Sequence, residues 1–159
     1  MATPSSVRLY ETRGATTILI DAEIKENGDL VLSGYDYGEA PEQTWGDSGY
    51  EYWVVLEAAH LGRLRHALLR IEFGLGWPLP AWLFNGLGLD DWDSDAIRGF
   101  LDAESIPYDD RTGAVADADK EHLTLALMRR CFGGEGSAVS LFVDFLKTQN
   151  IPYRFDTWV

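Results

Sequence analysis

The first half of the chain carries short apolar runs that are typical of β-strands. Residues 16–24 are rich in β-branched side chains, and residues 30–32 follow after an Asn27-Gly28 pair. Asn-Gly supplies the two positive-φ positions of a type I′ turn, so these runs are predicted to form a hairpin. Residues 8–10 are expected to add a short edge strand.

The segment after the hairpin changes character. Residues 34–49 are rich in glycine, proline and acidic side chains, which indicates a long exposed loop. Residues 50–56 are apolar and aromatic again, and they are predicted to return to the sheet as an antiparallel neighbour.

From residue 57 onward the apolar period lengthens from two to 3.6. An apolar stripe recurs at i, i+3, i+7 and i+10, formed by Leu61, Leu64, Leu68 and Ile71. This spacing predicts an amphipathic helix from residue 58 to about 72. Its opposite face carries polar side chains that are expected to be solvated, namely Arg63, His66 and Arg70.

The remaining two thirds contain two similar units in the same order. The matching segments are residues 67–74 with 126–133, and residues 100–108 with 145–153. Each unit is predicted to be a helix ending at Phe-Gly, a second helix, and an Ile-Pro-Tyr segment. Proline stops that second helix and favours an extended or edge-strand continuation. We interpret the units, about 61–108 and 121–153, as a degenerate duplication inside one domain, 1–159.

These patterns together predict an α+β fold. An antiparallel sheet from the N-terminal half would carry three to four helices packed on one face, and 159 residues suffice to bury a core. Cys131 is the one cysteine of the chain, which excludes an intramolecular disulfide and a thiolate metal cluster. The first residues lack a signal-peptide pattern and no apolar run reaches about 20 residues, so a cytoplasmic location is expected.

The net charge of -13 points to a cationic partner and away from nucleic acid and anionic membranes. Between Lys25 and Arg63 there are eight acidic residues and no basic residue. Six aromatic residues are interleaved with them: Tyr35, Tyr37, Trp45, Tyr50, Tyr52 and Trp53.

Rigid aromatic side chains next to carboxylates are favoured at protein interfaces. The predicted partner-binding residues are therefore Asp36, Tyr37, Glu39, Glu42, Trp45, Asp47, Tyr50 and Glu51. In the alternative interpretation, Trp45 and Tyr50 fold back into the core and the acids only solvate the loop.

Several patterns resemble known chemistry but have simpler explanations. Residues 91–95 resemble the start of a calcium loop, but Ala96 and Asp102 stand where an EF-hand needs Gly and Glu, so helix capping by Asp93 or Ser94 is favoured. The three histidines, His60, His66 and His122, lack metal-site spacing.

No nucleophile motif is present either. Cys131 lies within a helical pattern and is expected to be a buried, inert thiol. Residues 133–137 are expected to form a helix C-cap and a turn, with Ser137 as the next N-cap. No catalytic residue, metal or cofactor is predicted, and a non-enzymatic protein is favoured.

Residues 75–89 contain large apolar side chains: Trp77, Trp82, Leu83 and Phe84. They are expected to pack over the core, or to form a dimer or partner surface. An alternative function follows: a small hydrolase or small-molecule-binding domain with a pocket between the sheet and this segment. A structural, oligomerising module is a third possibility.

Residues 28–38 and 45–52 resemble small acidic bacterial proteins, some of which are similar to immunity proteins of polymorphic or contact-dependent toxin systems. This resemblance implies a cytoplasmic inhibitor that neutralises a secreted toxin, commonly a basic nuclease. It assigns no chemistry to individual residues.

Overall fold

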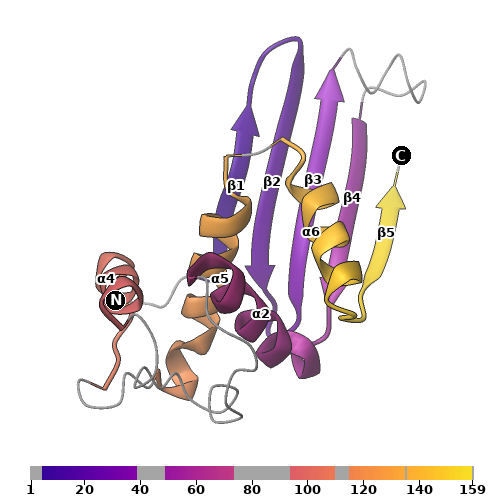
Figure 1. The fold of residues 1–159 in the computed structure, drawn as a ribbon. Helices are drawn as coiled ribbons and strands as arrows, with labels where there is room; N and C mark the ends of the chain where they lie inside the picture. Colours follow the sequence, from indigo (N-terminus) through magenta and orange to yellow (C-terminus); the bar gives the residue numbers. More distant parts are fainter. Residues whose placement is uncertain (1–4, 39–48, 74–93, 110–114, 135, 159) are drawn as a thin grey trace.

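A five-stranded antiparallel sheet and a layer of helices make up the fold (Figure 1). The computed structural model describes residues 5–38, 49–73, 94–109, 115–134 and 136–158. The strands are neighbours in chain order: β1 (Ser6–Thr12), β2 (Thr16–Ile24), β3 (Leu30–Gly38), β4 (Gly49–Leu56) and β5 (Arg154–Trp158). The α-helices are α2 (Leu61–Phe73), α4 (Ser94–Ala103), α5 (Lys120–Phe132) and α6 (Ala138–Thr148). Two short 3₁₀ helices, η1 (Ala58–His60) and η2 (Asp117–Asp119), precede α2 and α5. The predicted α+β class is confirmed, with the fifth strand coming from the C-terminus.

Side-chain alternation along the strands separates a covered face from an uncovered one. In β2, Ile20, Ala22 and Ile24 are buried, whereas Asp21 and Glu23 between them are partly exposed. Helix α5 contacts β1 and β2, and α6 contacts β3 and β4 on the same side (Figure 1). The buried side chains of the sheet and the helices form one core cluster. The opposite face of the sheet contacts none of the described helices.

The prediction of a loop from residue 34 was wrong in its first part. Strand β3 continues to Gly38, and it pairs with β2 over its whole length and with β4 as far as Tyr37. Gly34 is buried within it, beneath the ring of Tyr52 from β4. A glycine in a strand weakens it when nothing fills the missing side chain. Here a cross-strand tyrosine fills the space, so the strand continues.

The turn between β2 and β3 also differs from its prediction. Gly28 has φ 91°, but Asn27 does not take a positive φ, so the turn is not type I′. The Gly28 amide donates to the Lys25 carbonyl and the Lys25 amide to the Asp29 carbonyl, both at 2.9 Å. This is a type I turn followed by a glycine bulge. The Asn27 side chain accepts from the Asp29 amide at 3.0 Å, which explains the asparagine at this position.

Helix α2 occupies the predicted span, but one residue of the predicted stripe is misplaced. Leu61, Leu64 and Leu68 are buried, whereas Ile71 is 57% exposed. Leu69 is buried instead, and α2 packs against α5. The apolar face of α2 is therefore wider than the stripe that the sequence predicts.

The two Ile-Pro-Tyr units end their helices with the same backbone geometry. Ser105 and Asn150, at matching positions, both have φ 56°. The amide of the following isoleucine donates five residues back in each case, Ile106 to Leu101 at 2.8 Å and Ile151 to Leu146 at 2.9 Å. These are Schellman caps, and both isoleucines are buried. After the second cap the chain enters β5, the edge strand expected after the proline.

Candidate functional site

The uncovered face of the sheet carries the first of two candidate sites. Register places a row of partly exposed apolar and aromatic side chains there, which we call the sheet face: Leu19, Val31, Tyr35, Tyr37 and Trp53, with the nearly buried Val55. The rings of Tyr35 and Tyr37 lie 5.1 Å apart, centroid to centroid. Rigid aromatic groups on an open surface are suited to docking another protein.

Acidic side chains share this face, and most of them are already paired. Asp21 forms an ion pair with Arg8, Glu23 with Lys25, and Asp156 with Arg154. Glu51 is opposite Tyr35 in the β3–β4 register and forms no ion pair with any described residue. Glu51 is therefore the acid of this face that is available to an incoming cation.

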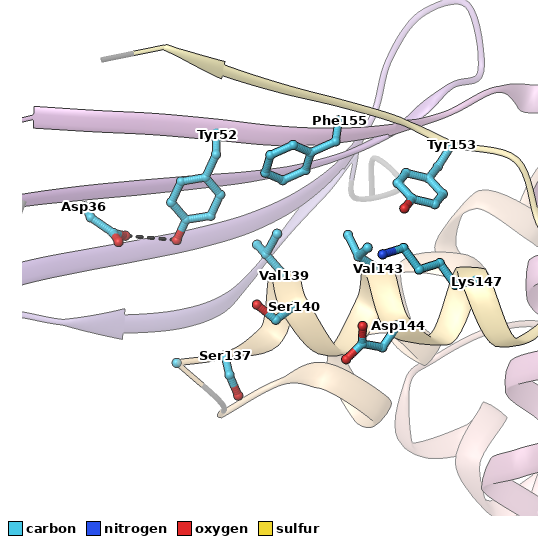
Figure 2. Close-up of a pocket in the computed structure, with 11 residues that line it drawn as sticks. Asp36, Tyr52, Ser137, Val139, Ser140, Val143, Asp144, Lys147, Tyr153 and Phe155 are labelled. Atoms are coloured by element: carbon cyan, nitrogen blue, oxygen red, sulfur yellow. Dashed lines mark hydrogen bonds between the residues drawn. The ribbon is translucent and has the colours of Figure 1, made fainter. Parts of the chain in front are cut away.

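The second candidate site is a groove between α6 and the β4–β5 side of the sheet, shown in Figure 2. It is open to solvent and encloses about 610 Å³. Helix α6 supplies one wall, and Tyr153 and Phe155 supply the other. The side chain of Phe155 is 46% exposed, which is a large exposed fraction for a phenylalanine. We call this site the α6 groove.

One end of the α6 groove is formed by Asp36 and Tyr52. The Tyr52 hydroxyl donates to Oδ1 of Asp36 at 2.9 Å (Figure 2). A side chain at Gly34 would have its Cβ 2.0 Å from the Tyr52 ring, so glycine is required for the ring to cross β3 and reach Asp36. Burial raises the pKa of Asp36, and the Tyr52 hydrogen bond opposes part of that rise.

The other end of the α6 groove carries Lys147. Its side chain extends back along α6 toward Val143, on the side of the groove where Tyr153 lies (Figure 2). Lys147 pairs with no acid in the part of the chain that the structure describes, Asp144 of the same helix included. The groove thus has a carboxylate at one end and an ammonium at the other.

The structure separates the predicted partner-binding residues. Asp36 lies on the helix side of the sheet, in the α6 groove, whereas Tyr37 and Glu51 lie on the sheet face. Tyr50 pairs with Asp36 in the β3–β4 register, and its side chain is outside the described ones. The other predicted residues also lie outside the described residues: Glu39, Glu42, Trp45 and Asp47.

Sequence reasoning missed the α6 groove. The alternative pocket was expected beside residues 75–89, which lie outside the described residues, whereas the groove lies beside α6. One signal was present in the sequence: Val139, Val143 and Lys147 are spaced four residues apart and share one face of α6.

The remaining sequence candidates have structural explanations. Burial raises the pKa of Cys131 to about 12, with a further contribution from the nearby Glu72, as expected for an inert thiol. His66 is partly buried rather than solvated, and burial lowers its pKa, aided by the charge of Arg70.

The predicted N-cap of α6 is present in position only. Ser137 stands at the N-cap of α6, but its side chain makes no capping hydrogen bond. Asp117 lies before α5 and forms an ion pair with Lys120. Within the described ranges, no three potential ligands gather into a metal site.

The chain matches no family model, no curated protein and no solved structure. Of the helices that the structure describes, none has the length and apolar character required to cross a membrane.

Proposed function

We propose that this protein is a non-enzymatic, acidic protein-binding domain that docks a cationic protein on its sheet face. The immunity-type resemblance refines the proposal: the partner would be a basic toxin that the domain neutralises. The observation that carries the proposal is the uncovered sheet face, where Tyr35 and Trp53 lie next to Glu51, an acid that forms no ion pair with any described residue.

The shape of this face favours a protein partner. The strands that carry it are paired on both sides from β2 to β4, so its side chains are held at fixed spacing. Tyr35, Tyr37 and Trp53 would bury much apolar area with little loss of side-chain entropy. The ion pairs at its edges, such as Arg8 with Asp21, resemble the polar rim that surrounds such interfaces.

The charge of the chain favours a basic partner. A net charge of -13 attracts a cationic protein and repels nucleic acid over distances beyond direct contact. Glu51 then supplies a local contact for an arginine or lysine, next to Tyr35 in the paired strand. Long-range attraction would speed association, and the local contact would slow dissociation.

The test uses the immobilised full chain to capture proteins from the source organism, followed by purification of the captured protein. Binding kinetics are then compared for wild type, Glu51→Lys and Glu121→Lys. Both variants change the net charge equally, but Glu121 is exposed on α5, away from the sheet face. We expect Glu51→Lys to weaken binding by about tenfold or more and Glu121→Lys to have a much smaller effect.

Two results would overturn the proposal. Equal losses in both variants would show that only the net charge matters. A captured protein that is itself acidic, or one whose binding is unaffected by Glu51→Lys, would place the interface elsewhere.

A further inference from the structure

The α6 groove has a carboxylate at one end and an ammonium at the other, with apolar side chains between them and the carboxylate of Asp144 on the α6 wall. Asp36 stands at one end, fixed by the hydroxyl of Tyr52, and Lys147 stands at the other end beside Tyr153 (Figure 2). Between these ends lie apolar side chains from both walls, Val139, Val143 and Phe155. The arrangement matches an elongated ligand with a cation at one end and an anion at the other.

Neither Asp36 nor Lys147 forms an ion pair with another residue in the part of the chain that the structure describes. Asp36 is partly buried, yet no described cation forms an ion pair with it. A desolvated carboxylate without a counterion is unfavourable unless a ligand supplies one.

The length of the groove indicates how long the ligand is. Ser140 lies at the Asp36 end of α6, and the seven-residue rise from Ser140 to Lys147 is about 10 Å. An extended peptide advances about 3.3–3.6 Å per residue, so three residues span this distance. Ser137 and Ser140 also line the groove, and the Ser140 hydroxyl can bond to a peptide backbone.

We propose that the α6 groove binds an extended peptide end of about three residues, with a basic first residue at Asp36 and a free carboxylate at Lys147. The middle side chain of the peptide packs against Val143 and Phe155. This site lies on the helix side of the sheet, so it is separate from the docking surface on the sheet face. The experiments can therefore refute peptide binding in the α6 groove without refuting protein docking on the sheet face, and the reverse is also true.

The experiment titrates the isotope-labelled full chain with a pool of free tripeptides that begin with arginine, and follows the backbone amide resonances. We expect saturable shifts at α6 and β5 residues such as Val143 and Phe155. The best pool member is then measured against Asp36→Asn and Lys147→Gln. Each change should weaken binding by about tenfold, as expected for the loss of one charge-assisted contact.

A double-mutant cycle that combines amidation of the peptide with Lys147→Gln tests the Lys147 contact specifically. Amidation removes the peptide carboxylate, so it should weaken binding to wild type but have little further effect in Lys147→Gln. Glu121→Gln, on the exposed side of α5, is the matched control and should bind as wild type does.

The proposal is wrong if no pool member shifts the groove resonances at millimolar concentration. It is also wrong if amidation weakens both proteins equally, or if Asp36→Asn binds normally. Asn can still accept the Tyr52 hydrogen bond, so this variant is expected to fold.

Discussion

Asp36 is a charged side chain on the face of the sheet that packs against helices. Its carboxylate accepts a hydrogen bond from Tyr52 but has no described cationic partner. Because burial raises its pKa, the folded state holds the proton more tightly than the unfolded state does. Ionisation of Asp36 therefore lowers the stability of the fold as the pH rises through its raised pKa. Below the pKa that Asp36 has in the unfolded chain, this loss of stability is absent.

The variant Asp36→Asn should consequently stabilise the protein at neutral pH. Asn keeps the acceptor for Tyr52 and removes the charge, so we expect a gain of up to about 0.5 kcal/mol, limited by solvent screening of a half-exposed group. Thermal unfolding should show Tm raised by about 1–2 °C near pH 7 and equal to wild type near pH 3. A lower Tm at neutral pH would show that the ionised carboxylate stabilises the fold.

At the scale of elements, the Gly34–Tyr52 contact allows β3 to continue while shaping the α6 groove. Gly34→Ala should displace the Tyr52 ring, since the new Cβ would overlap it. We expect a loss of about 1–3 kcal/mol in the free energy of unfolding, as for other overpacked sites.

Gly62→Ala is the matched control for this change. No heavy atom lies within 4 Å of the new Cβ, and the residue is helical, so a gain of about 0.5–1 kcal/mol is expected. Chemical denaturation of both variants measures the two effects. If Gly34→Ala proves as stable as wild type, the close approach of Tyr52 is not required.

The matching helix caps give a second prediction at this scale. Ser105 and Asn150 both adopt the left-handed conformation, which glycine tolerates best. Glycine should stabilise both positions, by up to about 1 kcal/mol at Ser105 and by less at Asn150, because asparagine already tolerates this region. Urea denaturation of the two single variants measures the difference. A loss of stability in Ser105→Gly would contradict the assigned geometry.

Local patterns in the sequence could predict much of the fold. Strand β2, the hairpin and α2 follow from residue period and turn residues, which act over a few positions. The end of β3 could not be predicted, since glycine is disfavoured in strands and Gly34 is accommodated by a tyrosine from another strand. The α6 groove could not be predicted either, because it depends on how α6 lies over β3 and β4 and on where Tyr153 and Phe155 pass it.

Across the whole molecule, charge and shape act at different ranges. The net charge of -13 belongs to the entire chain, whereas many acids of the sheet face are neutralised by neighbouring cations. The aromatic groups and Glu51 then determine where a partner that has been attracted can dock. Salt should weaken the long-range attraction by the net charge more than the local contacts of the aromatic groups and Glu51.

Association with the captured partner should therefore depend on ionic strength. Between about 0.1 M and 1 M salt the screening length falls from about 10 Å to about 3 Å, so the association rate should decrease by about tenfold or more. The dissociation rate should change less. Stopped-flow kinetics separates the two rates, and an association rate independent of salt would exclude electrostatic attraction.

Carboxyl footprinting of the complex tests the location of the interface most directly. A carbodiimide reagent labels exposed acids, and mass spectrometry compares the labelling of free and bound protein. We expect the partner to protect Glu51 strongly, while Asp102 and Glu121, exposed on α4 and α5, remain labelled as in the free protein. Full labelling of Glu51 in the complex, with protection on the helices instead, would contradict docking on the sheet face.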